Sequence, residues 1–339
     1  MKTDNYKAIL FGCAIGDALG MPVEGWKQEQ IRKYYGRITD LIDPLIVNDE
    51  HGNLTMQDEF GKIKYHTKGL KAGQWTDDTI LTIALAESIA EIRYINLKDI
   101  AQKQLHEFLY YEKSGSNRAF GKTTRDAMNN LARGVFPSGV IGGPGAAPAM
   151  KMAPVGIYMD ISNEIEDNLK NAEMIGKITH LDPRSVASGV VQAFAIHALL
   201  QNVSRDTFVD SITDICSRYE IKVTSEYSCY GMGSLSSRLR WIQNNKDASV
   251  EYAFKILGSS SNVLCCYPFT LFMFQKYFEK PLEGMIETVN YGGDCDTTGA
   301  IYGTLVGAKY GMIFPEKWIS KIENLEKIIA VSKKLERLS

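Results

Sequence analysis

The chain has 339 residues, and 38 lysines and arginines against 40 aspartates and glutamates give a formal net charge of −2 at pH 7. Hydrophobic residues make up 45% and charged residues 23%, an ordinary globular composition, and the absence of a long basic run removes electrostatic support for nonspecific nucleic-acid binding. No apolar run reaches the ~18 residues of a membrane span and no secretory segment follows Met1, so we expect no membrane association.

Six cysteines are scattered along the chain, mostly among apolar residues, and none has the spacing of a metal-binding motif. We therefore expect reduced, buried thiols in a cytoplasmic protein. Separately, we expect the protein to be a monomer. The cysteines are Cys13, Cys216, Cys229, Cys265, Cys266 and Cys295.

Residues 5–18 favour a helix, because the apolar residues from Ile9 to Ala14 fall on one face. We expect this helix to end within the small-residue stretch Gly16–Gly20, and Pro22 marks the break.

Glu24 follows in a short loop between small and apolar residues. A solvated surface glutamate is the simplest interpretation, although the apolar neighbours also suit a carboxylate beside a site. Residues 36–74 are the least regular part of the chain, and we expect a surface insertion there with a small hairpin at about 53–67. Elsewhere no strands alternate with helices. The sequence therefore predicts a mainly helical chain, and its length alone does not decide between one domain and two.

A first acidic cluster opens the next helix. Thr76, Asp77 and Asp78 directly precede the nearly all-apolar segment 80–86, which is typical of a buried helix. A plain cap is one interpretation, with the threonine as N-cap and the two carboxylates favoured by the helix dipole.

Two loops rich in small residues follow. The first, 115–124, joins two helices expected between residues 98 and 132, and it suits backbone-amide contacts to phosphate, although ordinary helix connections look similar. The second, 139–150, contains several glycines and prolines, and we expect it to line the wall of a pocket.

A well-marked helix begins after Asp182, with that residue as N-cap and Pro183 in the first turn. His180 precedes this helix start and is suited to contact a diphosphate or a ribose hydroxyl, whereas His197 inside the helix favours a core position. Further helices are expected at 206–220, 234–244, 248–257, 264–278 and 316–338.

Residues 292–299 read Gly-Gly-Asp-Cys-Asp-Thr-Thr-Gly and precede an apolar segment typical of a buried helix. The carboxylates of Asp294 and Asp296, followed by two hydroxyls, form an oxygen set that Mg²⁺ or Mn²⁺ prefers. The two leading glycines permit a sharp backbone bend. Later glycines at 299, 303 and 307 repeat every four residues, which favours close approach of another helix.

Two other kinds of site share part of this motif. A calcium-binding hand loop starting at Asp294 would need a glutamate at its twelfth position, but Leu305 stands there, so that site is excluded. A haloacid-dehalogenase-like phosphatase has Asp-x-Asp-x-Thr, which Asp294, Asp296 and Thr298 match. Its first aspartate ends a hydrophobic strand near the start of a domain, whereas two glycines precede Asp294. This phosphatase stays an alternative.

The chain thus places a hydroxyl and two carboxylates at the start of a buried helix twice. Burying four carboxylates without compensation would cost many kcal/mol. A pair of divalent cations is a simple compensation, and it favours a metal site over two unrelated helix caps.

The order of the motifs resembles the ADP-ribosylglycohydrolase family, which includes the dinitrogenase reductase-activating glycohydrolases. The similarity extends from about residue 6 to residue 318, and five motifs in the right order are highly specific. The motifs are Gly16-Asp17-Ala18-Leu19-Gly20 with Pro22-Val23-Glu24, Trp75-Thr76-Asp77-Asp78-Thr79, Ala149-Met150-Lys151-Met152-Ala153-Pro154, Thr179-His180, and Gly292 to Thr297.

The resemblance implies one compact, multi-helix, all-α domain over residues 1–339. It also implies a glycosidase with two Mg²⁺ or Mn²⁺ ions in a central cleft. This enzyme would remove ADP-ribose from a modified protein or small molecule, cleaving the N- or O-glycosidic bond at C1″ with an activated water. The metal ligands of the family match Thr76, Asp77, Asp78, Asp294, Asp296 and Thr297.

The same resemblance implies catalytic roles for Glu24, Asp78 and Asp296. Glu24 or Asp78 would assist proton transfer, and Asp296 would bridge both cations. ADP-ribose would lie across the cleft against the two small-residue loops and the histidine. The expected substrate contacts are Asn117, Phe120, Gly121, Gly145, Met150 and His180.

Two departures from the family pattern stand out. Lys151 replaces an arginine found in many members, which we expect to change a contact in the pocket wall. Cys265-Cys266 stands where an acidic residue is expected, beside the leaving group. Some relatives with this fold have lost activity and act as binding or structural proteins. The intact set of ligand positions favours an active enzyme over that alternative.

Overall fold

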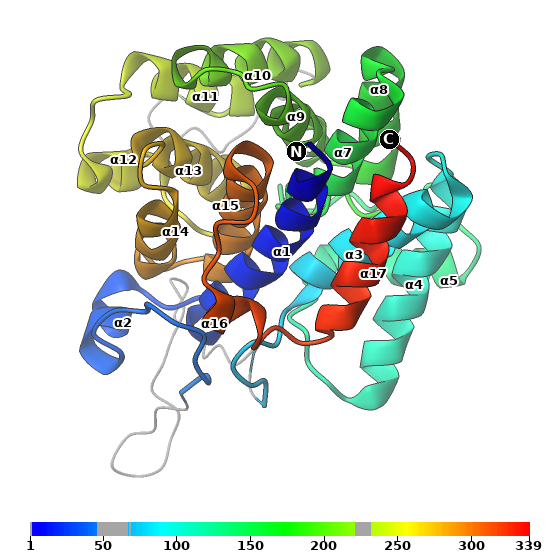
Figure 1. The fold of residues 1–339 in the computed structure, drawn as a ribbon, viewed down its shortest axis with the longest axis horizontal. Helices are drawn as coiled ribbons and strands as arrows, with labels where there is room; N and C mark the ends of the chain where they lie inside the picture. Colours follow the sequence, from blue (N-terminus) through cyan, green and yellow to red (C-terminus); the bar gives the residue numbers. More distant parts are fainter. Residues whose placement is uncertain (1, 46–66, 68, 221–231) are drawn as a thin grey trace.

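The computed structural model describes residues 2–45, 67, 69–220 and 232–339 (Figure 1). Apart from isolated bridges, the described chain contains helices and no strand, so the all-α prediction is confirmed. The hairpin predicted at about 53–67 falls almost entirely outside the described residues, as does most of the expected insertion.

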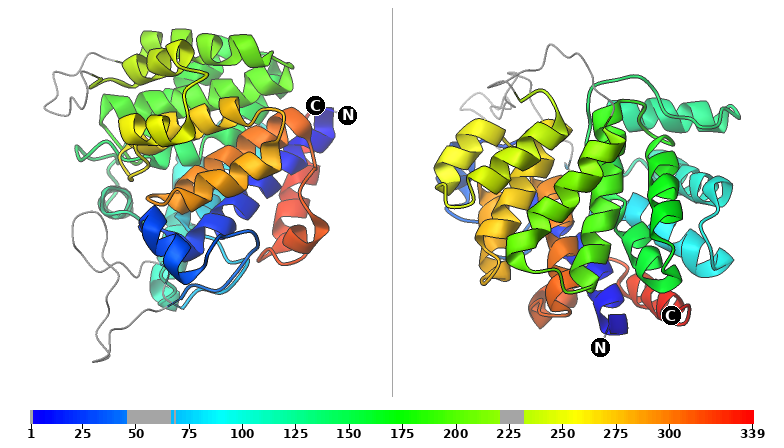
Figure 2. Two further views of the ribbon diagram at one scale, coloured as in Figure 1. Left: turned by 90° about the vertical axis from the view of Figure 1, so that its left-hand side faces the viewer. Right: turned by 90° about the horizontal axis from the view of Figure 1, so that it is seen from above.

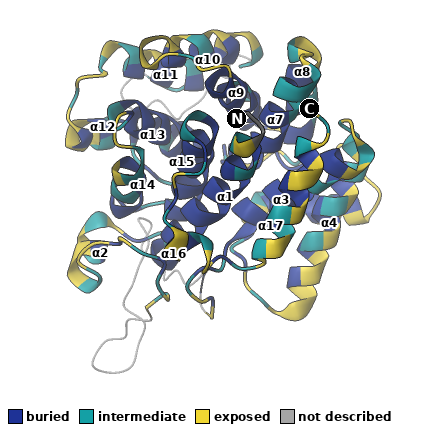
Figure 3. Ribbon diagram, viewed as in Figure 1, coloured by how far each residue is buried: buried dark blue, intermediate teal, exposed yellow. Residues whose placement is uncertain are grey.

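Two buried helices form the centre of the molecule. α1 (Lys2–Gly20) and α15 (Cys295–Tyr310) lie side by side in Figures 1 and 2, and their described residues are dark blue along most of their length in Figure 3. Their backbones nearly touch: a Cβ added at Gly303 would lie 2.0 Å or less from the carbonyl oxygen of Gly12, and one at Gly16 equally close to that of Gly299. The close approach predicted from the glycine spacing of α15 is confirmed, with α1 as the partner.

The first helix ends within the predicted stretch Gly16–Gly20. Gly16 and Gly20 each face the backbone of α15, at Gly299 and Cys295 respectively. The helix runs to Gly20, and a 3₁₀ turn, η1 (Met21–Val23), contains Pro22. The two glycines therefore serve the close packing of α1 on α15 as well as the end of the helix.

The other helices surround this pair in groups. α9 (Pro183–Leu200) packs against the α6, α7, α8 and α10 helices, α13 (Val263–Lys276) against α11, α12 and α14, and α3 (Asp77–Ile92) against α4 and α17. The remaining bounds are α2 (Gln28–Tyr34), α4 (Leu97–Ser114), α5 (Lys122–Ala132), α6 (Ala147–Met150), α7 (Ala153–Ser162), α8 (Ile165–Gly176), α10 (Arg205–Tyr219), α11 (Leu235–Asn244), α12 (Val250–Leu257) and α14 (Pro281–Asn290).

The single helix predicted over 316–338 is wrong. The chain forms α16 (Glu316–Ile319) and α17 (Leu325–Glu336), separated by a bend. The bend follows from tertiary contacts: the backbone nitrogen of Glu323 donates to Gly73 O at 2.9 Å, and its carboxylate pairs with Arg118 at 2.8 Å. These contacts fasten the bend beside the start of α3.

One sequence expectation about membranes needs correction. The stretch Asp4–Val23 is long and apolar enough to cross a membrane by length and composition. In the structure 94% of the 18-residue apolar window within it is buried, as expected for a core helix. The five described cysteines are free thiols, four of them buried and Cys265 partly exposed, which agrees with the prediction for them.

Candidate active site

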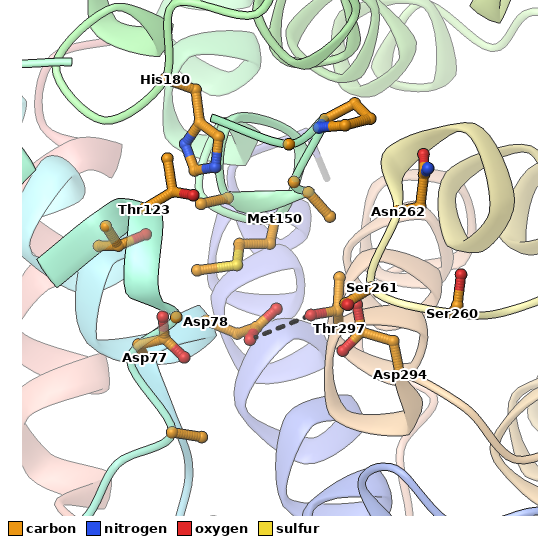
Figure 4. Close-up of a pocket in the computed structure, with 18 of the residues that line it drawn as sticks. Asp77, Asp78, Thr123, Met150, His180, Ser260, Ser261, Asn262, Asp294 and Thr297 are labelled. Atoms are coloured by element: carbon orange, nitrogen blue, oxygen red, sulfur yellow. Dashed lines mark hydrogen bonds between the residues drawn. The ribbon is translucent and has the colours of Figure 1, made fainter. Parts of the chain in front are cut away.

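The two acidic clusters meet, although more than two hundred residues separate them in the chain. α3 begins at Asp77 and α15 at Cys295, and the two helix starts face each other (Figure 4). The hydroxyl of Thr297 donates to Asp78 Oδ2 at 3.4 Å, which joins the two clusters directly. The repeated motif therefore builds one site.

A sharp turn carries the second cluster. Gly292 and Gly293 have φ angles of +82° and +83°, which L residues rarely adopt, so the predicted bend is confirmed. The approach to Asp294 is thus a helix, α14, followed by a turn. A phosphatase of the haloacid dehalogenase type needs a strand there, so that alternative is wrong.

The same turn holds the loop of Glu24 in place. Gly25 N donates to Gly293 O at 2.7 Å, and Gly293 N donates to Trp26 O at 2.8 Å. Consequently, one carboxylate oxygen each of Glu24, Asp294 and Asp296 lie within 4.8 Å of one another. Among the described residues, this is the group of acids that can share a single cation.

Burial and mutual repulsion act on these carboxyl groups. Burial raises the pKa of Asp77 and Asp78 well above the usual range, and the charge of Asp296 raises both further. Burial also raises the pKa of Asp296. Carboxyl groups that are buried this close together cannot all stay ionised unless cations bind them, and without cations some of them keep a proton.

The donor set fits divalent cations. Carboxylate and hydroxyl oxygens are the ligands that Mg²⁺ and Mn²⁺ prefer. Asp78 Oδ1 is buried and has no hydrogen-bond partner among the described residues, so it is available for a ligand. Thr76 and Thr297 add hydroxyls beside it, at 3.3 and 3.4 Å from its other oxygen.

Asp17 is a further buried acid beside the site, and it binds the start of α3. The sequence did not lead us to expect it among the site residues. Asp17 lies on α1, fully buried, and accepts hydrogen bonds from the backbone nitrogens and hydroxyls of Thr76 and Thr79. Burial, with the charge of Asp296, raises its pKa to about 7. An aspartate within an apolar helical stretch was the available signal.

A cavity of about 610 Å³ extends from the acids toward His180 (Figure 4). Most of the residues predicted for the site line it: Glu24, Asp77, Asp78, Phe120, Gly121, Gly145, Met150, His180, Asp294, Asp296 and Thr297. Thr76 is fully buried behind them. Asn117 does not line the cavity, and its side chain accepts a hydrogen bond from Ala119 N at 3.1 Å within the loop.

His180 closes the end of the cavity far from the acids. It is 3% exposed, and burial lowers its pKa to about 3, so the ring is neutral at ordinary pH. Its Nδ1 has no hydrogen-bond partner among the described residues. Gly145 fits against the other side of the ring, since an added Cβ would lie 2.6 Å from Nε2.

Lys151 does not lie in the cavity wall, which corrects the expectation from its motif. It is fully buried and donates to Gln104 Oε1 at 3.3 Å and to Thr179 Oγ1 at 3.2 Å. Burial lowers its pKa to about 7. Its contacts hold the segment that carries His180 against α4.

The opposite wall was not predicted from the sequence. Ser260, Ser261, Asn262 and Arg238 line the cavity, and an isolated bridge joins the backbones of Asn262 and Gly145. The run of small polar residues before α13 was the available signal. A second cavity of about 410 Å³ adjoins the first, and the two share Ser260, Ser261, Cys265 and Asp294.

Comparison with known proteins gives one consistent result. The family model described as ADP-ribosylglycohydrolase matches residues 1–339. An uncharacterized protein of Archaeoglobus fulgidus is 30% identical, over 99% of this chain and 97% of its own length. ADP-ribosylarginine hydrolase Tri1 of Serratia proteamaculans is 24% identical, over 98% and 79%. A solved ADP-ribosylglycohydrolase-related protein complex shares the fold, with a TM-score of 0.65, 23% identity, and coverage of 100% and 99%.

Proposed function

The chain belongs to the ADP-ribosylglycohydrolase family, and from this premise we propose that it releases ADP-ribose from modified proteins or small molecules. The reaction is hydrolysis of the N- or O-glycosidic bond at C1″. The observation that carries the proposal is the meeting of Glu24 with the acids of α3 and α15 at one end of a cavity whose other end is His180.

The shape of the site suggests how the substrate binds. The distal ribose lies beside the acids, and the diphosphate lies along the N-terminus of α5, where Gly121, Lys122 and Thr123 line the cavity. The nucleoside lies toward His180. The leaving group then departs on the opposite side of the acids, where the second cavity begins at Asp294.

The acids have distinct tasks in this arrangement. Two divalent cations, Mg²⁺ or Mn²⁺, would be held by Thr76, Asp77, Asp78, Asp294, Asp296 and Thr297. When bound, they supply positive charge that polarises sugar hydroxyls and water. Asp296 would help to hold them, because its carboxylate lies within 4.8 Å of those of Glu24 and Asp294 and its charge acts on Asp77 and Asp78. Glu24 lines the first cavity beside the acids, and its neighbour Gly25 lines the second. Its carboxylate can take the proton of the attacking water there.

A release assay tests the proposal directly. Purified protein, first freed of metal and then given Mg²⁺ or Mn²⁺, is incubated with arginine-linked and serine-linked ADP-ribosylated peptides. We expect free ADP-ribose from at least one of them, only with the cation present. Asp296→Asn is the matched variant and should release none.

Failure to release ADP-ribose from any linkage, by protein that binds ADP-ribose, would favour the inactive binding relative. Failure to bind ADP-ribose at all would remove the proposed site. These two results are distinguished by calorimetry of ADP-ribose binding to the same preparation.

A further inference from the structure

The first turn of α3 is capped by another helix. Its own N-cap, Thr76, makes no side-chain capping hydrogen bond. Instead the carboxylate of Asp17, from α1, accepts from Thr76 N at 2.9 Å and from Thr79 N at 3.1 Å. Free amides at a helix start need acceptors when buried, so Asp17 does what a local cap does elsewhere.

The same carboxylate also accepts hydrogen bonds from the hydroxyl groups of Thr76 and Thr79. Thr79 Oγ1 donates to Asp17 Oδ2 at 2.6 Å, and Thr76 Oγ1 lies 3.0 Å from Asp17 Oδ1, against 3.3 Å from Asp78 Oδ2. A hydroxyl has one proton and two acceptor lone pairs. If Thr76 gives its proton to Asp17, its lone pairs remain for a cation beside Asp78.

We propose that Asp17 is a positioning residue for the cation site, which fixes the start of α3 and turns the oxygen of Thr76 toward the cation. Asp17 does not line the cavity, so it acts through Thr76 and its neighbours and does not touch the substrate. The inference rests on the proposed function, because it assumes that the start of α3 holds a cation.

A purely structural role makes a different prediction. Asp17 is fully buried between α1 and α3, so its loss lowers stability in either case. Only a positioning role also lowers the cation affinity of protein that is still folded. Residues that orient metal ligands typically change metal affinity by about 10–100-fold when replaced.

Asp17→Asn is the decisive variant. It keeps the size of the side chain, but its NH₂ group faces amide and hydroxyl donors and cannot accept from them. Mn²⁺ affinity, measured by titration with electron paramagnetic resonance on folded protein, should fall by about 10–100-fold. In metal-free protein, the amides of Thr76 and Thr79 should exchange hydrogen faster than in the unmodified chain.

Two further variants complete the test. Thr79→Val removes the 2.6 Å hydroxyl contact with Asp17 but keeps the backbone contact, and it should weaken Mn²⁺ binding less than Asp17→Asn. Ser204→Ala removes the cap of α10, where Ser204 accepts from Thr207 N at 3.3 Å, and should lower stability with unchanged Mn²⁺ affinity.

Two kinds of result would contradict the proposal, one for the positioning role of Asp17 and one for the cation site itself. Unchanged Mn²⁺ affinity in folded Asp17→Asn overturns the positioning role. If that variant does not fold, the positioning role is overturned by a Thr79→Val variant whose Mn²⁺ affinity and amide hydrogen exchange are both unchanged. Absence of Mn²⁺ binding in the unmodified chain would instead show that the cation site of the proposed function is wrong.

Discussion

Glu24 acquires its place from the backbone of a turn far along the chain. The hydrogen bonds between Gly25, Trp26 and Gly293 bring its carboxylate within 4.8 Å of those of Asp294 and Asp296. At this distance the carboxylate can both ligate a cation and accept a proton from water. Its charge, and not its shape, is therefore the property to change.

Replacing Glu24 by Gln should separate binding from turnover. The amide keeps the shape and hydrogen-bonding capacity, so calorimetry should find ADP-ribose affinity changed by only a few fold. Single-turnover release should slow by about 10²–10⁴, the range for losing a general acid–base group. Asp296→Asn should lose cation binding, ADP-ribose binding and turnover together. Release at the parent rate by the Glu24 variant would leave Asp78 as the base.

His180 presents a neutral ring to the cavity. Since its pKa is lowered to about 3 by burial, the ring does not change charge between pH 5 and 8. His180→Ala should weaken ADP-ribose binding by about 1–2 kcal/mol, the scale of leaving one buried polar group without its hydrogen bond, and by the same amount at pH 6 and pH 8.

Gly145→Ala tests the position of the same ring. Its added Cβ would lie 2.6 Å from Nε2 of His180 and must displace the ring, so this variant should also weaken ADP-ribose binding. Calorimetry of both variants measures the effect. Affinity equal to that of the unmodified chain in His180→Ala would remove His180 from the ligand site.

At the scale of elements, the contact between α1 and α15 aligns both halves of the site. α1 carries Asp17 and leads to Glu24, and α15 has Asp294 as its N-cap and Asp296 in its first turn. Glycines at the crossing let the two backbones touch, and the site lies at one end of this contact. The separation of the two helices therefore sets the separation of the acids.

Gly303→Ala tests the crossing. Helix propensity alone would stabilise the variant by about 1 kcal/mol. The new Cβ, however, would lie only 1.9 Å from the carbonyl oxygen of Gly12, so the helices must separate. Overpacking of this kind costs about 1–3 kcal/mol or more, which urea denaturation should detect as a net loss of stability.

Gly143→Ala is the matched control for stability, because its Cβ would meet no atom within 4 Å. It should change the midpoint of unfolding little. A Gly303→Ala variant as stable as this control would mean that α1 and α15 are farther apart than the structure has them.

At the scale of the whole molecule, the acids make stability depend on pH and cations. A raised carboxyl pKa means that the folded, cation-free protein keeps protons that the unfolded chain releases above pH ~4. The contribution of these groups is therefore full below that pH and is lost as pH rises through the folded pKa, about 7 for Asp17.

Chelator-treated protein should accordingly lose melting temperature between pH 5 and pH 8. Added Mg²⁺ or Mn²⁺ should raise the melting temperature more at pH 8 than at pH 5, because protons compete for the carboxylates at low pH. Differential scanning fluorimetry across this range measures the effect, with Asp296→Asn as the comparison. A cation effect of equal size at both pH values, or none, would contradict it.

The two cavities predict separate determinants for the two parts of the substrate. Phe254 lines the second cavity and not the first. Phe254→Ala should therefore raise the KM for an ADP-ribosylated peptide while leaving inhibition by free ADP-ribose unchanged. Met150→Ala, in the first cavity, should weaken inhibition by ADP-ribose. Equal effects of Phe254→Ala on both measurements would place the leaving group elsewhere.

Local patterns in the sequence were enough to predict the all-α class, most helices, the turn at Gly292-Gly293 and the two acidic helix starts. These features depend on hydrophobic periodicity and on short motifs, which neighbouring residues determine. The spacing of Gly299, Gly303 and Gly307 likewise predicted close packing with another helix.

The tertiary structure alone decided which groups meet. It showed that α1 is the partner of α15, that Asp17 caps α3, and that Lys151 is buried behind the cavity. The bend at residues 320–324 and the wall at 260–262 also depend on contacts between distant segments. Periodicity describes which face of an element is buried, but not which element covers it, because pairing depends on the free energy of the whole packed chain.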